Sequence, residues 1–244
     1  MWEQRAAMRP RLIAFDYDGT LADDGGISPA TREALQEAKR AGFLLGLVTG
    51  RPHDELLGIC PEIGLFDLVV DENGSVLHFP GTGEVEDLGP TPPERFAEEL
   101  VRRAIRHSRG RVVVRTWRPH IEEALAVIRD LGLALDVIPN KYAVMIVPRG
   151  IDKGTGLAAG LERLGVTASE TVAVGDDEND RAMFRVAALR VAVANAVEAL
   201  KAEADLVLER PNGAGMAEFI RERLLKAPET LRPSRRGKEP SGAT

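Results

Sequence analysis

Short apolar runs that end in polar residues constrain this chain more than any other feature of its sequence. The runs that share this pattern are Arg11–Asp16, Phe43–Val48, Leu68–Val70 and Thr171–Val174. Each has the length of a strand and carries no alternation, which is typical of strands buried on both faces of a sheet. Helical patterns stand between them: Ser28 is a favourable N-cap and Pro29 a favourable first residue for the first helix, which Gly42 ends. Strands that alternate with helices predict parallel βα units.

The same alternation returns after Gly150. The expected helices are Lys153–Leu164, Glu178–Val186, Val197–Glu203 and Gly215–Leu225, and the further strands are Leu189–Val193 and Asp205–Leu208. Gly165 is placed to end the first of these helices. Together with the earlier units, these elements predict a doubly wound parallel sheet.

Between the two βα segments the pattern changes. The expected elements there are a hairpin of Ser75–His78 with Glu84–Leu88, a helix Pro92–His107, a strand Arg111–Trp117, a helix Pro119–Leu131 and a hairpin of Leu135–Ile138 with Tyr142–Val147. This block predicts an α+β module inserted into the chain. The fold class is therefore α/β, with a doubly wound parallel sheet and a small inserted α+β cap.

The domain boundaries follow from these changes of pattern. We expect residues 1–77 and 151–226 to form the core and residues 78–150 to form the cap. Residues 227–244 are rich in Pro, Arg, Lys, Ser and Gly, a composition that predicts a disordered tail. The Gly-rich segment Asp23–Gly26 is a candidate hinge between open and closed positions of the cap.

Polar residues gather at the expected carboxyl ends of the strands, where ligands bind in sheets of this kind. Asp16, Asp18, Thr49 and Asp176 follow predicted strands, and Lys153 opens the helix after the insert. Each segment alone also has a structural explanation. Two carboxylates and a glycine suit a turn at the end of a strand, a Thr–Gly pair suits a turn with a helix N-cap, and a lone lysine suits the surface.

The segment Gly175–Asp180 places several acidic residues behind one strand. A cation would neutralise such a cluster, and the alternative is that these acids cap the first turn of the following helix. The Thr49 hydroxyl and the Gly50 amide can donate two hydrogen bonds to a phosphate.

Four segments, DYDGT, VTGR, DKG and GDDEND, occur in this order. Together they resemble the four motifs of the haloacid dehalogenase superfamily of phosphotransferases. Ile27–Gly42, Val191–Asp205 and Asn212–Gly215 are similar to the Cof-like branch of that superfamily. The resemblance covers about residues 11–75 and 150–222, and the insert stands where that branch carries its class IIB α+β cap.

The resemblance implies a Rossmann-like core and a magnesium-dependent phosphoric monoester hydrolase. Asp16 would attack phosphorus and form an aspartyl-phosphate, and Asp18 would protonate the leaving oxygen and then activate water. The implied Mg²⁺ ligands are the Asp16 carboxylate, the Asp18 carbonyl, Asp176 and, directly or through water, Asp180, with Asp177 and Asn179 behind them. The implied phosphate-binding groups are Thr49, Gly50 and Lys153.

The substrate is less constrained than the chemistry. Arg51 can meet a second anionic group or serve as a structural residue at a helix start, and Asn73 can bind substrate or be a turn residue with positive φ. The cap residues on strand ends or hairpin turns are Arg115, Trp117, Arg118, Asn140, Lys141 and Tyr142, and no single one stands out. His53 can serve as a proton shuttle or lie on a helix surface, and we expect the helix surface. The compact cap is similar to those of archaeal-type phosphoglycolate phosphatases and some sugar-phosphate phosphatases, which implies a small polar substrate.

Composition limits the partners and the setting. A net charge of -6 argues against a general nucleic-acid binder. One cysteine, Cys60, cannot form an internal disulfide, so we expect a buried or half-buried thiol in a reducing compartment, the cytoplasm. No apolar run reaches membrane-spanning length, and residues 1–10 lack the apolar stretch of a secretory signal. The expected partner is a small-molecule phosphate ester, and the chain is expected to be a monomer or a homodimer.

Two alternatives to a phosphatase remain open. A phosphomutase of the same superfamily would return the phosphoryl group to a sugar, and a non-catalytic module would bind a phospholigand without turnover. The intact Asp16 and Asp18 argue against the second alternative.

Overall fold

The computed structural model describes residues 9–23, 26–140, 142–226, 228 and 231. Most of the expected tail at residues 227–244, Lys141 and the middle of the candidate hinge Asp23–Gly26 lie outside the described residues. Within the described part of the chain, no helix combines the length and apolar character that a membrane crossing requires.

The elements follow the expected order closely. The helices are α1 (Pro29–Arg40), α2 (His53–Ile59), α3 (Glu94–Arg102), α4 (Ile121–Asp130), α5 (Lys153–Leu164), α6 (Arg181–Val186), α7 (Glu198–Glu203) and α8 (Asn212–Glu218), which continues into a π-helical segment Phe219–Leu225. The strands of the large sheet are β1 (Leu12–Asp16), β4 (Leu44–Val48), β5 (Leu68–Asp71), β6 (Val76–Phe79), β7 (Glu84–Asp87), β12 (Thr171–Gly175), β13 (Leu189–Ala192) and β14 (Leu206–Val207). The remaining strands are β2 (Ala22–Asp23), β3 (Gly26–Ile27), β8 (Ser108–Arg109), β9 (Val114–Trp117), β10 (Leu135–Asn140) and β11 (Ala143–Pro148).

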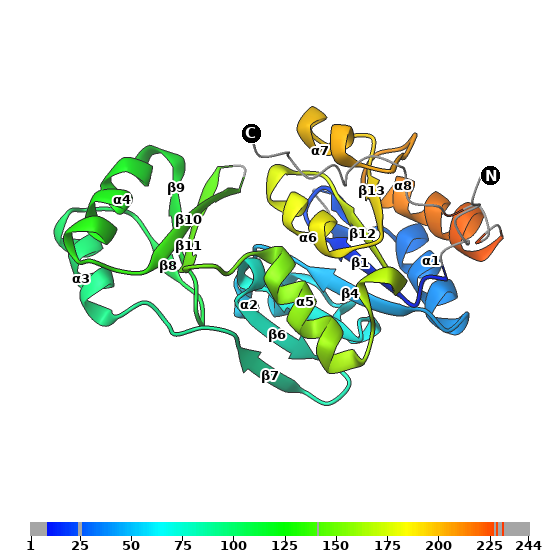
Figure 1. The fold of residues 1–244 in the computed structure, drawn as a ribbon, viewed down its shortest axis with the longest axis horizontal. Coiled ribbons are helices and arrows are strands. Elements are labelled where there is room, and N and C mark those ends of the chain that lie inside the picture. Colours follow the sequence, from blue (N-terminus) through cyan, green and yellow to red (C-terminus); the bar gives the residue numbers. More distant parts are fainter. Residues whose placement is uncertain (1–8, 24–25, 141, 227, 229–230, 232–244) are drawn as a thin grey trace, which may run out of the picture.

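The large sheet has eight strands in the order β14-β13-β12-β1-β4-β5-β6-β7 (Figure 1). The pairs from β14 to β5 are parallel. β1 lies in the middle, where Leu12 pairs with Thr171 of β12 and with Leu44 of β4. All five residues of β1 are buried, which is why its sequence is an uninterrupted apolar run up to Asp16.

Helices cover this sheet as a doubly wound arrangement requires. The chain passes from β1 through α1 to β4 in one direction and from β12 through α6 to β13 in the other. Because such crossovers are right-handed, the two directions place α1 and α6 on opposite faces. α1 packs with α8, and α5 packs with α6 (Figure 1). The strand order reverses at β1, so the carboxyl end of β1 is the expected ligand site.

The insert forms a separate four-stranded antiparallel sheet in the order β10-β11-β9-β8, shown at the left of Figure 1. Helices α3 and α4 pack against each other beside it. Phe96, Leu100, Val114 and Ile146 are among the residues of its own hydrophobic core. The α/β class with a small inserted α+β module is therefore confirmed.

One expectation within the insert was wrong. The hairpin of β6 and β7 was expected to open the inserted module, and instead it extends the large sheet, with β6 antiparallel to β5. All four residues of β6 are buried, which is typical of a strand that lies inside a sheet covered on both faces. The domain boundaries at residues 78 and 150 stay a prediction.

Helix ends show where local signals succeed and where they fail. α5 has the predicted bounds, because Asp152 caps its first turn and Gly165 ends it at φ 62°. The helix expected at residues 92–107 is shorter, since Ala104 takes a left-handed conformation at φ 55° and the chain then enters β8. Ser28 caps α1 as expected, through a hydrogen bond from the backbone N–H of Thr31.

Candidate functional site

The site lies at the carboxyl ends of the central strands. Asp16 ends β1, Thr49 follows β4, and Asp176 follows β12. Parallel pairing aligns Asp16 with Val48, the residue before Thr49. The topology therefore brings three segments distant in sequence to one edge of the sheet.

Lys153 is the central cation of the site. Its ammonium nitrogen Nζ lies 2.6 Å from Asp16 Oδ1 and 2.6 Å from Asp180 Oδ1. All three side chains are buried, so the surface alternative for Lys153 was wrong. Lys153 is the first residue of α5, and the Asp152 cap fixes the start of that helix. The helix start therefore directs a lysine, rather than a backbone amide alone, at the end of β1.

The carboxylates of Asp16, Asp176 and Asp180 form a buried cluster in which one oxygen from each lies within 4.8 Å of the others. Three carboxylates and one ammonium leave an excess of two negative charges when all are ionised (3 − 1 = 2). Carboxylate oxygens are the ligands that Mg²⁺ prefers, and a divalent ion would balance this excess. The residues present therefore fit a divalent metal ion.

The pKa values in the cluster are shifted by burial and by the excess of negative charge. Burial raises the pKa of Asp16 well above its ordinary value; Lys153 opposes this, while Asp180 and Asp176 add to it. Burial would lower the pKa of Lys153, but the carboxylates of Asp16 and Asp180 outweigh it and raise that pKa above its ordinary value. Lys153 is consequently held as an ammonium ion.

Asp180 is fixed by the turn that contains it. Its Oδ2 accepts hydrogen bonds from the backbone N–H groups of Asp176 at 2.9 Å and Asp177 at 3.0 Å. A side chain on Gly175 would meet the Asp180 Cβ at 2.5 Å, so this turn requires glycine there. Asp176 in turn accepts a hydrogen bond from the Thr20 hydroxyl at 3.1 Å.

Asp18 forms an ion pair with Arg51. Its two oxygens accept hydrogen bonds from Arg51, with distances of 2.6 Å and 2.8 Å. Arg51 also donates to Glu55 at 2.5 Å. Arg51 is thus both a helix-start residue and a cation beside the expected acid.

Thr49 and Gly50 form the turn after β4. Thr49 is buried, and its hydroxyl oxygen accepts a hydrogen bond from the Arg51 backbone N–H at 3.2 Å. A side chain on Gly50 would lie 2.6 Å from the amide nitrogen of Asn140, which belongs to the insert. The tip of the β10–β11 hairpin therefore reaches the turn in which phosphate binding is expected.

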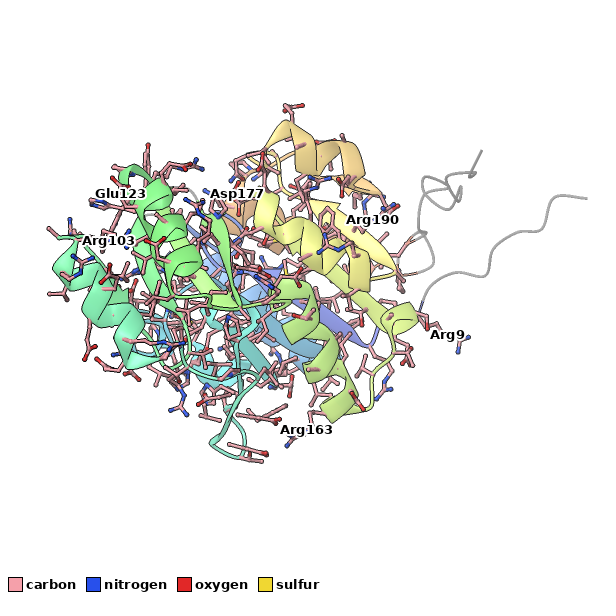
Figure 2. The ribbon with its side chains drawn as sticks, turned by 60° about the vertical axis from the view of Figure 1, so that its left-hand side comes forward. Arg9, Arg103, Glu123, Arg163, Asp177 and Arg190 are labelled. Carbon is pink, nitrogen blue, oxygen red and sulfur yellow. The ribbon has the colours of Figure 1, made fainter. Side chains whose placement is uncertain are left out.

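Asn73 and Asn179 face each other across this edge. Asn73 has φ 58°, as expected for a turn, and its side-chain oxygen lies 3.4 Å from the amide nitrogen of Asn179. The Asn73 amide nitrogen and the Asn179 oxygen are buried without a partner among the described residues. Asp177 instead caps the next turn through the Glu178 N–H at 2.8 Å. Figure 2 shows Asp177 where the connection after β12 meets the insert, and β10 contacts the turn Glu178–Asp180.

A cavity of about 590 Å³ lies between the large sheet and the insert. Its lining includes Asp18, Gly50, Arg51, Glu55, Arg115, Asn140, Tyr142 and Asn212. Of the cap candidates, Arg115, Asn140 and Tyr142 line it, whereas Trp117 and Arg118 do not, and Lys141 lies outside the described residues.

His53 was expected on a helix surface, and that expectation was wrong. It is buried, with its Nδ1 2.6 Å from Asp71 Oδ2, and its ring stands edge-on to that of His78 at 5.1 Å. Burial of Asp71 at the end of β5 requires a partner, and the first residue of α2 supplies it. Cys60 is buried, as expected, and burial raises the pKa of its thiol to about 11.

Comparison with known proteins shows which family the chain is similar to. A family model described as haloacid dehalogenase-like hydrolase matches residues 13–88 and 122–220. The phosphoglycolate phosphatase of Archaeoglobus fulgidus is 34% identical over 222 residues, covering 87% of this chain and 96% of that protein. The phosphoglycolate phosphatase of Methanopyrus kandleri is 31% identical over 230 residues, covering 87% and 97%. A haloacid dehalogenase-like hydrolase from Bacteroides thetaiotaomicron shares the fold, with a TM-score of 0.75 and 23% identity, over 87% of this chain and 98% of that one.

Proposed function

This chain belongs to the haloacid dehalogenase-like hydrolases, and from that premise we propose that it is a magnesium-dependent phosphatase that hydrolyses small phosphate monoesters through a phospho-aspartate on Asp16. The observation that carries the proposal is the buried cluster of Asp16, Asp176 and Asp180 around Lys153. Such a cluster combines a nucleophile with charge compensation, which are the two requirements of phosphoryl transfer.

Asp16 is the nucleophile in this proposal. Lys153 holds one of its oxygens and leaves the other to attack phosphorus, forming an aspartyl-phosphate as the ester bond breaks. The Thr49 hydroxyl, the Gly50 N–H and the Lys153 ammonium bind the phosphoryl oxygens and stabilise their charge. When bound by Asp16, the Asp18 carbonyl, Asp176 and Asp180, Mg²⁺ supplies the charge neutralisation that lets a carboxylate approach a phosphate.

Asp18 moves the protons. It gives a proton to the leaving ester oxygen, and then accepts one from the water that hydrolyses the aspartyl-phosphate. Because its carboxylate is paired with Arg51 in the structure, that pair must loosen for Asp18 to carry a proton.

The proposed substrates are phosphoglycolate or sugar phosphates. Two observations support this class: similarity to archaeal phosphoglycolate phosphatases, and a cavity of about 590 Å³ lined by charged and polar side chains. A cavity of this size admits a small polar ester.

The test is phosphate release from p-nitrophenyl phosphate and a panel of small esters, with Mg²⁺ or with EDTA. We expect release to require Mg²⁺ and to fall at least about 1000-fold in Asp16→Asn, because the nucleophile is lost. Asp130→Asn, an exposed carboxylate of α4 paired with Arg103, is the control and should retain activity. A folded, Mg²⁺-loaded protein that releases no phosphate from any ester, but interconverts sugar phosphates, would favour the phosphomutase alternative.

A further inference from the structure

Two guanidinium groups from different parts of the fold face the cavity beside the site. Arg51 comes from the turn between β4 and α2, and Arg115 comes from β9 of the insert. Their side chains keep 31% and 25% of their surface exposed, so both remain accessible from the cavity. The large sheet and the insert therefore each contribute one permanent positive charge to the same space.

Glu55 joins the two arginines. Its Oε1 accepts a hydrogen bond from Arg51 Nη1 at 2.5 Å, and its Oε2 accepts one from Arg115 Nη1 at 2.8 Å. Glu55 lies in the first turn of α2 and also lines the cavity. A carboxylate thus already stands between the two guanidinium groups, with one oxygen directed at each.

The arrangement of Arg51, Glu55 and Arg115 favours a carboxylate as the ligand. Two guanidinium groups about one carboxylate form charge-assisted hydrogen bonds in a fixed, planar geometry. A carboxylate carried by the substrate has the same shape and charge as the Glu55 carboxylate and can take its place without leaving either arginine unpaired. A neutral hydroxyl is a weaker replacement, because it would give the two permanent cations no charged acceptor.

The position of Arg51 limits the size of that substrate. Arg51 follows Thr49 by two residues, and it binds Asp18, which follows Asp16 by two residues. The two guanidinium groups therefore lie close to the expected position of the phosphoryl group. A carboxylate that reaches them while phosphorus faces Asp16 must be only a few bonds from the phosphate.

We propose that Arg51 and Arg115 form a subsite for a carboxylate of the substrate, and that Glu55 occupies this subsite until the substrate carboxylate displaces it. The inference rests on the proposed phosphatase function and specifies a short phosphorylated carboxylic acid as its substrate class. Because Arg115 belongs to the insert, the bound carboxylate also ties the insert to the large sheet. Because Arg51 also binds Asp18, a carboxylate on Arg51 weakens the hold of Arg51 on the proposed acid.

The experiment compares two esters of equal length, phosphoglycolate and hydroxyethyl phosphate, which differ in the carboxylate. In wild type, kcat/KM should favour phosphoglycolate. In Arg115→Gln the ratio of the two kcat/KM values should fall about 10- to 100-fold, the range for one charge-assisted hydrogen bond. Arg115→Lys keeps the charge but loses the planar fork, so its ratio should fall between those of wild type and Arg115→Gln.

Glu55→Gln gives the more specific result. Without the competing carboxylate, KM for phosphoglycolate should fall several-fold, whereas a merely structural Glu55 would predict a rise in KM or a loss of stability. Arg109→Gln is the matched control, since Arg109 also belongs to the insert sheet and pairs with a glutamate, Glu94, outside the cavity. Its ratio of kcat/KM values should equal that of wild type.

The outcomes separate the subsite from the phosphatase function. Equal losses for both esters in Arg115→Gln, a wild-type preference for hydroxyethyl phosphate, or a higher KM for phosphoglycolate in Glu55→Gln would each overturn the subsite and leave the phosphatase standing. No phosphate release from either ester by Mg²⁺-loaded wild type would overturn the proposed function itself. Thermal melting of each variant establishes that it is folded before its kinetics are compared.

Discussion

Asp71 and His53 form a buried pair next to the site, and the pair responds to pH. Asp71 has no exposed surface, and its Oδ1 has no hydrogen-bond partner among the described residues. Burial raises the pKa of Asp71 to about 6, with His53 opposing the rise. The hydrogen bond to Asp71 raises the pKa of His53 above its ordinary value. Both groups thus bind protons more tightly in the folded chain than in the unfolded chain.

The sign of the pH dependence follows from this difference. A raised carboxyl pKa gives stability at low pH that is lost as pH rises from about 3.8 to about 6, and a raised histidine pKa gives stability that is lost as pH rises above about 6.5. The rise in the pKa of Asp71 from 3.8 to about 6 corresponds to a change of roughly 3 kcal/mol in the free energy of unfolding. We expect the free energy of unfolding of wild type, relative to Asp71→Asn, to decrease between about pH 5 and about pH 7.5. Urea denaturation of both proteins at the two pH values measures this difference in the free energy of unfolding. If the stability of wild type relative to Asp71→Asn increases as pH rises, the raised pKa values of the pair are contradicted.

Single residues differ in how far sequence alone locates them. Asp16, Thr49 and Asp176 follow strand signals, so a strand-by-strand interpretation places them at one edge of the sheet. The pairing of His53 with Asp71 has no such signal, because it joins residues 18 apart, one at the start of α2 and one at the end of β5, which meet only in the folded chain. The Arg51–Glu55–Arg115 bridge was missed for the same reason, since Arg115 reaches Glu55 only after the insert folds back.

At the scale of elements, the turn after β5 anchors the insert. Glu72 has φ 50° and a fully buried side chain, and its carboxylate accepts the backbone N–H groups of residues 111–113 at 2.7, 2.7 and 2.8 Å. The His53 N–H approaches the same carboxylate at 3.3 Å. A Cβ on Gly110 would lie 2.2 Å from Glu72 Oε1, so a larger residue there would push this carboxylate away from its donors. One carboxylate thus attaches the start of β9 to the large sheet.

Glu72→Gln tests this anchor. The glutamine amide group would direct N–H groups at N–H donors, so we expect the free energy of unfolding to fall by about 2–4 kcal/mol. Hydrogen exchange should accelerate at residues 111–113 before it does so in β1. Asp87→Asn, which removes an exposed partner of Arg111, is the control and should change stability by less than about 0.5 kcal/mol. Unchanged exchange at residues 111–113 in Glu72→Gln would show that this attachment does not hold the insert.

Elements with local signals were predicted well, and pairings between distant elements were not. The bounds of α5 follow from a cap and a terminal glycine, both adjacent in sequence. The membership of β6 and β7 in the large sheet depends on which sheet offers a free edge. The sequence of the hairpin does not indicate which sheet that is. α3 was predicted too long, because the left-handed Ala104 lacks the glycine that usually marks such an end.

At the scale of the whole molecule, the two larger hydrophobic cores of the described residues are separate clusters, and a smaller third cluster in the insert contains Val113, Met145 and Val147. The insert packs Phe96, Leu100, Val114 and their neighbours in one cluster, and the large sheet buries Phe15 and Phe66 in another. Separate cores allow separate opening, because each cluster is lost only when its own elements unfold. We therefore expect the insert to lose its own packing while the core of the large sheet stays intact.

Phe96→Ala tests whether the insert opens separately from the large sheet. Loss of the fully buried ring should cost about 3–5 kcal/mol within the insert. Native-state hydrogen exchange should then lose protection in β9 and β11 while β1 and β12 keep theirs. Phe66→Ala, a matched change in the large core, should lower protection in β1 and β12 instead. Equal loss in all four strands for Phe96→Ala would mean that the chain opens as one unit.

The hairpin that extends the large sheet also has a consequence for pairing between copies of the chain at this edge. β7 is one of the two edge strands of the large sheet, and three of its four residues, Glu84, Glu86 and Asp87, are acidic. Arg163 of α5, labelled in Figure 2, pairs with Glu84 and Glu86 on one face and leaves the backbone edge itself uncovered by that contact. A second molecule adding its β7 to this edge would align like charges along the seam. The hairpin thus ends the sheet with a charged border that opposes edge-to-edge aggregation during folding and at high concentration.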